Sequence, residues 1–397
     1  MTIRPIHPFP ARMAPELALD ALAALPKRST VLDPMAGSGT VIRQAVELGH
    51  RAVGFDADPL AVLMTKVWTT GTSSVDVRNE YARLVEDAER VDLRSDRLPW
   101  VVDDQETSEF MKYWFGADQR KTLQRIAFVL HRRRNSRLGV RRQAAIEFLT
   151  IALSRIIITK DQGASLARDA SHSRPHKVAE DSSYDVLLGL GRSVELLLNR
   201  MPETMAGTAR VEVGDARKIP LRKASVDAVL TSPPYLNAID YMRGHRLSLV
   251  WFGYQLKYLR EIRGTSIGAE RAKTSADTHV HLVGRSMSSG EDLPRRFQSM
   301  IQRYAYDLLS MSSEISRVLK PGGSATLVVG NSCLKGTFIR NSEGVKTAAT
   351  LSGLELVSAK ERDLPSSSRY LPTPSSGALS KRMRTETVLT FHKPHLA

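Results

Sequence analysis

The segment Thr231-Ser232-Pro233-Pro234-Tyr235 combines residue types that could act on a flat heterocycle with an exocyclic amine. It follows the alternating apolar run 225–230, which predicts a short buried strand. Proline cannot donate a ladder hydrogen bond, so the two prolines end the strand and leave a stiff loop at a sheet edge. The Ser232 hydroxyl and the Pro233 carbonyl could accept from the amine, and the Tyr235 ring could stack on the heterocycle. The structural alternative is a proline-capped strand end with a packed tyrosine.

A second candidate site lies far upstream, at Asp33-Pro34-Met35-Ala36-Gly37-Ser38-Gly39-Thr40. The apolar run 30–32 predicts a strand that leads directly into Asp33. The two glycines allow a tight turn and a close approach of the backbone to a ligand. A helix is expected over 40–48 with its N-terminus at the same place, and a strand over 51–55 ends at Asp56. Together these elements predict a βαβ nucleotide-binding unit.

The residue types of this unit restrict its ligand. The turn lacks the third glycine of the dinucleotide fingerprint, and the Asp33 carboxylate would repel a pyrophosphate. A carboxylate at this position suits a positively charged group, such as the ammonium of an amino acid. Asp56 is placed to accept from two ribose hydroxyls. A ligand with a ribose, no phosphate and an amino-acid tail is S-adenosylmethionine.

Taken together, the two motifs resemble those of the S-adenosylmethionine-dependent DNA amino-methyltransferases of the Ser-Pro-Pro-Tyr type, which methylate cytosine N4 or adenine N6. The resemblance extends to 7–10, 54–59, 213–216 and 318–330. It implies an α/β fold, the Rossmann-like class I methyltransferase fold, with a mostly parallel seven-stranded sheet. A helical insertion and a second basic loop and helix insertion are expected within it.

The resemblance also assigns roles to individual positions. The catalytic residues that it implies are Ser232, Pro233, Pro234 and Tyr235. The cofactor-binding residues that it implies are Phe9, Asp33, Pro34, Ala36, Gly37, Gly39, Thr40, Asp56, Ala57, Asp215 and Ala216. In the family the aspartate at position 215 faces the adenine amino group. Core packing is the alternative for Phe9, and a simple turn is the alternative for Asp215.

The charge balance indicates a polyanionic partner. The chain of 397 residues has 57 Lys and Arg against 42 Asp and Glu, a formal net charge of +15, although its apolar and charged contents are ordinary for a soluble globular protein. The basic run 131–137, followed by Arg141 and Arg142, would repel itself without nearby anions. A solvated helix end and loop is the alternative. The predicted nucleic-acid-binding residues are Arg132, Arg133, Arg134, Arg137, Arg141, Arg142, Arg174, Arg243 and Arg263.

Several other chemistries are disfavoured by the sequence. Cys333 is the single cysteine, which excludes an intramolecular disulfide and a cysteine-based zinc site. It also lacks the preceding proline of a carbon-5 methylation nucleophile. His172 and His176 have no carboxylate or cysteine to complete a ligand set, so no metal site is expected. No apolar run has membrane-span length and 1–15 has no signal-peptide h-region, so a cytoplasmic protein is expected.

The insertions and the predicted elements divide the chain as follows. We expect the core at 1–70, 209–240 and 298–397, a helical insertion for DNA recognition at 71–208, and a second insertion at 241–297. Helical segments are predicted over 79–91, 108–130, 143–159 and 297–319, a long loop over 260–290, and a final hairpin of strands over 354–358 and 385–391. The aromatic cluster 113–115 is expected in the core of the first insertion.

These observations predict methyl transfer to a base of double-stranded DNA. The target amine lies inside a duplex, so the base must be flipped out, and stacking on Tyr235 would return about 1–3 kcal/mol. In the family, serine at position 232 leans toward cytosine N4. The alternatives are adenine N6, an RNA or tRNA amine, and a nucleic-acid-binding protein without activity. A cognate restriction or defence system is an open possibility, and the oligomeric state is not predicted.

Overall fold

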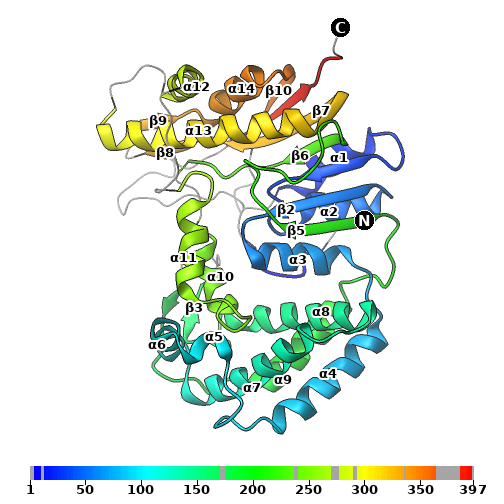
Figure 1. Cartoon of the computed structure of the whole chain (residues 1–397), viewed down its shortest axis with the longest axis vertical. Helices are drawn as coiled ribbons and strands as arrows, with labels where there is room; N and C mark the ends of the chain where they lie inside the picture. The colour runs from blue at the N-terminus through cyan, green and yellow to red at the C-terminus, as the bar shows by residue number, and fades with distance from the viewer. Residues whose placement is uncertain are drawn as a thin grey trace. The chain divides into compact units, whose positions relative to one another are not determined.

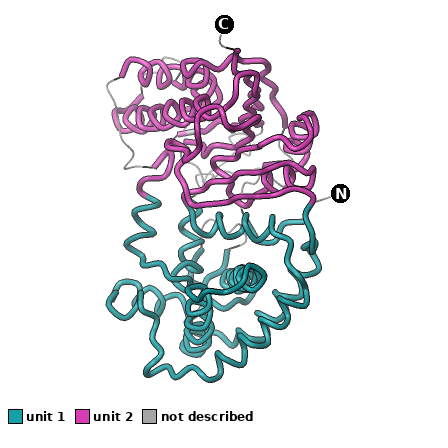
Figure 2. The backbone as a smooth tube through the Cα atoms, turned by 45° about the vertical axis from the view of Figure 1, so that its right-hand side comes forward, with its two compact units in different colours: residues 1–10, 58–205, 240–263 teal, residues 11–57, 206–239, 264–397 magenta. Residues whose placement is uncertain are grey.

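The computed structural model describes residues 4–9, 13–169, 175–236, 240–269, 277–288, 293–334, 337–363 and 385–395. The chain forms two compact units, which Figure 2 shows in different colours. Unit 1 comprises residues 1–10, 58–205 and 240–263, and unit 2 comprises residues 11–57, 206–239 and 264–397. The segment 241–297, predicted as one insertion, therefore contributes to both units. The predicted role of the insertions in DNA recognition stays a prediction.

Unit 2 contains one seven-stranded sheet in the order β10-β11-β7-β6-β1-β2-β5 (Figure 1). The strands are β1 (Thr30–Asp33), β2 (Arg51–Asp56), β5 (Thr208–Val213), β6 (Val226–Thr231), β7 (Leu319–Gly330), β10 (Glu355–Asp363) and β11 (Thr385–His392). Neighbouring strands are parallel except where β11 pairs with β7 and β10. This mostly parallel sheet confirms the predicted α/β, Rossmann-like fold class.

Helices and a small hairpin complete unit 2. They are α1 (Pro15–Ala23), α2 (Thr40–Glu47), α12 (Thr278–Ser288), α13 (Arg295–Val318), α14 (Asn341–Leu351), β8 (Ser332–Leu334) and β9 (Thr337–Ile339). Helix α2 packs on β1 and β2, whereas α14 packs on β7, β10 and β11. Leu32, Phe55, Val229, Leu327 and Phe391 are fully or almost fully buried in the core between these elements. Burial of such side chains is the main term that stabilises the sheet.

Unit 1 is mostly helical. Its helices are α3 (Pro59–Thr69), α4 (Ser74–Glu89), α5 (Pro99–Val102), α6 (Gln105–Trp114), α7 (Ala117–Arg134), α8 (Val140–Ile157), α9 (Val186–Leu198), α10 (Met242–Leu249) and most of α11 (Leu256–Thr265). The short strands β3 (Ala167–Arg168) and β4 (His176–Lys177) pair in antiparallel fashion. Helix α8 packs on α3, α4, α7, α9 and α10. Its residues from Ala145 to Ile157 are buried, except Arg155.

Side-chain caps explain where several unit 1 helices begin. Asp58 accepts from Leu60 N and precedes Pro59, whose fixed φ suits the first helical position of α3. Ser73 and Asp104 cap α4 and α6 in the same way. Each cap satisfies a backbone N–H that the helix leaves without a partner. Polar residues at these positions therefore define the helix boundaries.

The predicted helix over 108–130 is two helices in the structure. Helix α6 ends at Trp114 and α7 begins at Ala117, because Phe115 and Gly116, the N-cap residue of α7, both adopt extended conformations. Trp114 and Phe115 lie in the core of unit 1, which confirms that part of the aromatic prediction. Tyr113 is 55% exposed and lies outside that core, with the Lys177 Nζ 5.0 Å from its ring centroid.

The prediction of a long loop over 260–290 is wrong in part. Helix α11 continues to Thr265, and α12 occupies Thr278–Ser288. Val280, Val283, Gly284 and Met287 are buried at helical spacing, but the glycine, serine and histidine between them hid this period in the sequence. Residues 266–269 and 277 lie outside these helices, and 270–276 and 289–290 lie outside the described residues.

The C-terminal elements agree with the prediction. Helix α13 matches the segment expected over 297–319, and β10 and β11 form the expected antiparallel hairpin. Most of the basic loop between these strands lies outside the described residues. Among the helices that the structure describes, none is long and apolar enough to cross a membrane.

Candidate active site

The two sequence motifs meet at neighbouring strand ends of unit 2. Strands β1 and β6 are paired in parallel, so their carboxyl ends lie at the same edge of the sheet. Thr231 Oγ1 donates to Asp33 Oδ1 across 2.7 Å, and Met35 N donates to the same oxygen across 3.1 Å. The hydrogen bond from Thr231 joins the glycine turn to the Ser-Pro-Pro-Tyr loop, although the two motifs are far apart in sequence.

The glycine turn adopts a conformation that requires its glycines. Gly37 has φ 52° and Gly39 has φ 89°, in the left-handed region that other residues rarely adopt. Gly39 precedes α2, so the N-terminus of that helix lies at the turn. Gly37 N donates to Asp56 Oδ2 across 2.8 Å, and Ala36 N donates to Phe55 O across 2.8 Å. The turn is therefore held against the end of β2.

The other predicted cofactor residues of this edge follow from the same turn. Asp33, Ala36 and Thr40 are buried, each with an exposed fraction of 6% or less. Pro34 lies inside the turn, and Ala57 follows Asp56 at the end of β2. The structure thus brings the Asp33 to Thr40 segment and Asp56 together, as the sequence predicts for one ligand site.

Two carboxylates give this edge its electrostatic character. Burial raises the pKa of Asp33 to about 7, although its hydrogen bonds from Thr231 and Met35 act in the opposite direction. The neighbouring Asp56 carboxylate raises it further. A buried carboxyl with a like charge beside it is stabilised by a cation. The site therefore favours a positively charged ligand group.

Asp215 forms an ion pair with Arg217, which was not among the residues predicted from the sequence. Arg217 Nη2 donates to Asp215 Oδ2 across 2.7 Å, and Arg217 Nη1 donates to the buried Asp307 of α13 across the same distance. Burial opposes ionisation of Asp215, but Arg217 holds the pKa of Asp215 below its ordinary value. Ala216, predicted to bind the cofactor, is buried. The paired charges fix the loop after β5 to α13.

Backbone and tyrosine contacts support the Ser-Pro-Pro-Tyr loop, which the sequence predicts to be catalytic. Ser232 Oγ donates to Val328 O of β7 across 2.9 Å. The fully buried Tyr304 of α13 donates its hydroxyl proton to Pro234 O across 2.7 Å. A hydroxyl has one proton, so Ser232 presents only acceptor lone pairs to any further partner. Pro233 is buried between these two anchored residues.

Tyr235 packs inward from this loop. Its ring is half-buried against the unit 2 core. Burial raises the pKa of Tyr235 to about 12, and the Glu386 carboxylate acts in the same direction, whereas a hydrogen bond with the Gly330 backbone opposes it. The phenol therefore stays protonated at neutral pH. The predicted stacking of Tyr235 on a base stays a prediction.

Phe9 belongs to unit 1 and lies in an aromatic cluster there. Its ring stacks on Tyr241 with a centroid distance of 4.7 Å and lies 5.6 Å from the His245 ring. Nδ1 of the buried His245 is 2.5 Å from Asp58 Oδ2. These contacts explain the partial burial of Phe9 without a ligand, and its cofactor role stays a prediction.

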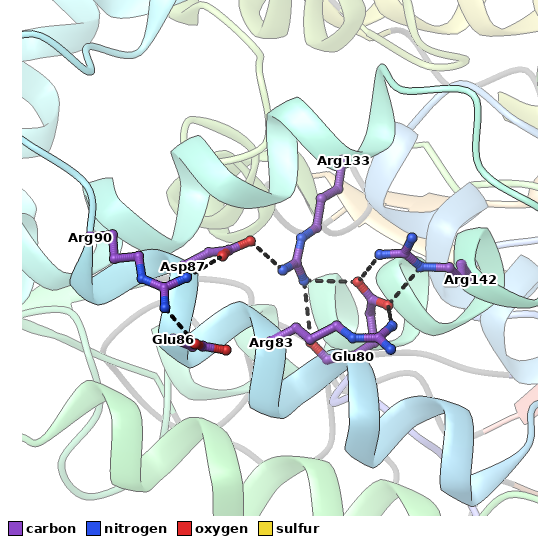
Figure 3. A network of polar contacts seen from close by, with 7 residues as sticks. All are labelled: Glu80, Arg83, Glu86, Asp87, Arg90, Arg133 and Arg142. Atoms are coloured by element: carbon purple, nitrogen blue, oxygen red, sulfur yellow. Dashed lines mark hydrogen bonds and ion pairs between the residues drawn. The ribbon is translucent and has the colours of Figure 1, made fainter.

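Two of the predicted DNA-binding arginines take part in an internal ion-pair network (Figure 3). Arg133, 11% exposed, lies 2.9 Å from Glu80 and 2.6 Å from Asp87. Arg142 lies 3.0 Å from the same glutamate, whose side chain is 1% exposed. This network links α4 to α7 and α8. Arg133 and Arg142 therefore have a structural role that the sequence did not predict, and their predicted role in binding DNA stays a prediction.

Of the other arginines predicted to bind DNA, some are exposed and some contact other groups of the protein. Arg132, Arg137 and Arg141 are exposed, with the Arg132 guanidinium 5.9 Å from the Phe128 ring centroid. The guanidinium of Arg134 donates to Phe252 O. The other members of the predicted set are Arg243 and Arg263, which both contact Asp240, and Arg174, which lies outside the described residues.

No group of three or more His, Cys, Asp and Glu side chains in the described part of the chain could hold a metal ion. The prediction of no metal site also concerned His172, which lies outside that part. His176 lies in β4 and is exposed.

The chain is similar to known methyltransferases, of which three are described here. No family model matches the chain. The chain is 22% identical over 377 residues to the type II methyltransferase M.BsoBI of Geobacillus stearothermophilus, covering 79% of this chain and 71% of that protein. It is 10% identical to a solved S-adenosylmethionine-dependent methyltransferase of Methanosarcina mazei, with 97% of this chain and 100% of that one covered and a TM-score of 0.35. It is 11% identical to a solved TehB-like methyltransferase of Corynebacterium glutamicum, with 96% and 89% covered and a TM-score of 0.31.

Proposed function

We propose that this chain is an S-adenosylmethionine-dependent DNA methyltransferase that acts on the exocyclic amine of a flipped base. The observation that carries the proposal is the hydrogen bond from Thr231 to Asp33, which joins the Ser-Pro-Pro-Tyr loop to the glycine turn. One loop has the acceptors that an amine requires, and the other has the carboxyl that a cationic cofactor requires. Their direct connection supports a single site for both substrates.

The residues of unit 2 fit the cofactor. S-adenosylmethionine supplies an activated methyl group on a positively charged sulfonium, and its amino-acid tail has an ammonium. The Asp33 and Asp56 carboxylates favour these positive charges. Asp56 lies at the end of β2, where a carboxylate can accept from ribose hydroxyls. Asp215, fixed by Arg217, can accept from the adenine amino group.

The catalytic loop provides the acceptors for the base. The amine is a poor nucleophile because its lone pair is delocalised into the ring. Ser232 donates its own proton to Val328, so its oxygen can accept one N–H, and the Pro233 carbonyl can accept the other. These bonds draw the nitrogen out of the ring plane and free its lone pair. Tyr304 fixes the loop, so that attack on the methyl carbon begins from a defined position.

DNA is proposed as the nucleic acid, and cytosine N4 as the target. The similarity to a type II methyltransferase and the net charge of +15 support a DNA substrate. Ser232 supports cytosine, because serine at this position leans that way in the family that the motifs resemble. Adenine N6 and an RNA amine are the alternatives. A cytoplasmic location and a cognate restriction or defence system belong to the same proposal.

The proposal is tested by transfer of tritium from labelled S-adenosylmethionine to unmethylated genomic DNA and, separately, to bulk tRNA. We expect acid-insoluble label in DNA and none in tRNA. Asp56→Ala serves as the matched variant and should weaken cofactor binding, as measured by calorimetry, before it affects turnover at saturation. Label in tRNA alone would show that the substrate is RNA and not DNA. Absence of both methyl transfer and cofactor binding would refute the proposed methyltransferase activity.

A further inference from the structure

Unit 1 contains a cluster of four arginines on α10 and α11, two of which contact the carboxylate of Asp240. Asp240 Oδ2 lies 2.7 Å from Arg263 Nε and 3.4 Å from Arg243 Nε. Arg260 of α11 pairs with Glu106 of α6 through two nitrogen–oxygen contacts. The fourth arginine is Arg246, which lies three residues after Arg243 on α10 and therefore on the same side of that helix.

Arg246 differs from its neighbours because the described residues give its guanidinium no carboxylate of its own. Its Cζ lies 5.1 Å from the Phe110 ring centroid, which positions the planar group. Its Nε is buried and has no hydrogen-bond partner in the described part of the chain. Burial lowers the pKa of Arg246 below its ordinary value, and Arg263, Arg243 and Arg260 act in the same direction, although Asp240 opposes them.

The charges of this cluster favour a bound anion. Four arginines lie among three carboxylates, Asp240, Glu106 and Asp104, which leaves an excess of one positive charge. A buried N–H without a partner costs free energy that a bound acceptor would recover. The guanidinium fork matches the oxygen spacing of a phosphate. Asp240 already places a carboxylate oxygen against two of the arginines, as a phosphate oxygen would lie.

We propose that Arg246, together with Arg243 and Arg263, forms a subsite for one backbone phosphate of the DNA substrate. Asp240 competes for the same arginines in the free protein. This inference rests on the proposed function for the identity of the anion. The position in the chain supports it, because Asp240 follows the Ser-Pro-Pro-Tyr loop directly after the short segment 236–239. A phosphate held here would be a neighbour, along the chain, of the residues that bind the base.

The test measures binding of a fluorescein-labelled DNA duplex by anisotropy from 50 to 300 mM KCl. Arg246→Gln should weaken binding about 5- to 20-fold at the lowest salt and reduce the slope of log affinity against log salt by about 1. Asp240→Asn should strengthen binding about 3- to 10-fold, since it removes the competing charge. Arg246→Lys keeps the charge but not the fork, so it should retain the slope and recover part of the affinity.

The matched control is Arg78→Gln on α4, which removes one positive charge from an exposed pair with Glu195. If Arg246→Gln gives the same slope and affinity as this control, while circular dichroism shows native helix content and the wild type methylates DNA, the subsite is refuted. If inorganic phosphate raises the melting temperature of the wild type but not of Arg246→Gln, and the DNA slope is unchanged, the site binds free phosphate instead of the DNA backbone. If the variants change DNA binding but the wild type transfers no methyl group, the subsite stands and the proposed enzyme does not.

Discussion

The Asp33 carboxyl has opposite effects on the stability of the fold and on the binding of a cationic ligand. Its carboxyl is 3% exposed, and its pKa of about 7 means that ionisation costs free energy in the cofactor-free protein. The carboxylate is nevertheless the group that a bound cation would stabilise. Such a conflict between local stability and charge is typical of functional sites. The residue scale therefore gives the sharpest tests of the cofactor site.

We expect the pH dependence of cofactor binding to follow Asp33. Below about pH 7 the carboxyl is protonated and the site loses a negative charge, so the dissociation constant for S-adenosylmethionine should rise as pH falls from 8 to 6. Asp33→Asn should bind the cofactor at least about 10-fold more weakly at pH 8, equivalent to about 1.4 kcal/mol, with a flat pH profile. Calorimetry at several pH values measures both effects, and an unchanged profile in the variant would contradict the assignment.

The same substitution should change stability in the opposite direction. A carboxyl with a raised pKa in the folded state destabilises the protein as pH rises from about 4 to about 7, because the unfolded chain ionises first. Asp33→Asn removes that cost, so the cofactor-free variant should be more stable than wild type at pH 8, by about 1–3 kcal/mol. Urea unfolding at pH 5 and pH 8 measures the difference, which should shrink at the lower pH.

Removal of the Ser232 hydroxyl should lower the rate of methyl transfer without changing cofactor binding. Ser232→Ala deletes the acceptor for the amine while Asp33 and the glycine turn remain, so turnover should fall at least about 100-fold with cofactor affinity nearly unchanged. Single-turnover methyl transfer and cofactor calorimetry separate the two. Equal turnover in the variant and the wild type would remove the catalytic role of this hydroxyl.

At the scale of elements, α13 supports both loops of the site. Tyr304 donates to the Pro234 carbonyl of the catalytic loop, and Asp307, one turn further along the helix, binds the Arg217 that holds Asp215. Both side chains are fully buried. Buried polar groups on the core face of a helix are costly unless they are paired, and here each partner is a loop that the proposed function requires. Helix α13 therefore acts as the positioning element.

Tyr304→Phe tests this role. The substitution keeps the ring and its packing but removes the hydrogen bond to Pro234, so we expect a 5- to 20-fold fall in kcat at nearly constant cofactor affinity. A merely structural role would lower the melting temperature without moving kcat at 25 °C. Steady-state kinetics with saturating DNA, together with thermal unfolding, distinguish the two results.

The ion-pair network of α4, α7 and α8 is a second element-scale feature. Burial opposes ionisation of Glu80, but Arg142, Arg133 and Arg83 hold the pKa of Glu80 below its ordinary value. Glu80→Gln should destabilise the protein by about 2–4 kcal/mol at pH 7, because Arg133 would keep only Asp87 as a charged partner. Glu195→Gln, in the exposed pair with Arg78, is the control and should have little effect in chemical denaturation. Equal effects of the two substitutions would contradict the structural role of the network.

The strands, the glycine turn and the catalytic loop were predictable because they depend on local signals. Apolar runs, Gly37, Gly39 and the prolines at 233 and 234 each restrict the backbone at their own position. Arg217 and Tyr304 were not predictable as parts of the site, since their roles depend on partners distant in the chain. The weak period of α12 and the pairing of Arg133 with Glu80 were missed for the same reason: tertiary packing outweighs composition.

At the scale of the whole molecule, the arginines that contribute to the positive net charge have different roles. The chain has 57 Lys and Arg, but several arginines that the sequence marks for DNA are paired internally, such as Arg133 with Glu80. Exposed Arg132, Arg137 and Arg141 remain available for a phosphate backbone. The net charge of +15 should therefore attract DNA at low salt, while a smaller set of arginines determines the slope of the salt dependence.

The central claim is that Ser232 and its loop direct methyl transfer to an amine of DNA. The most direct measurement is nucleoside mass spectrometry of unmethylated genomic DNA after incubation with S-adenosylmethionine and either the wild type or Ser232→Ala. We predict N4-methylcytosine with the wild type and at least about a 100-fold smaller amount with the variant. N6-methyladenine would support the proposed DNA methyltransferase activity but show that its target is adenine and not cytosine. No methylated base in DNA, with a modified nucleoside appearing only when tRNA is supplied, would contradict the account.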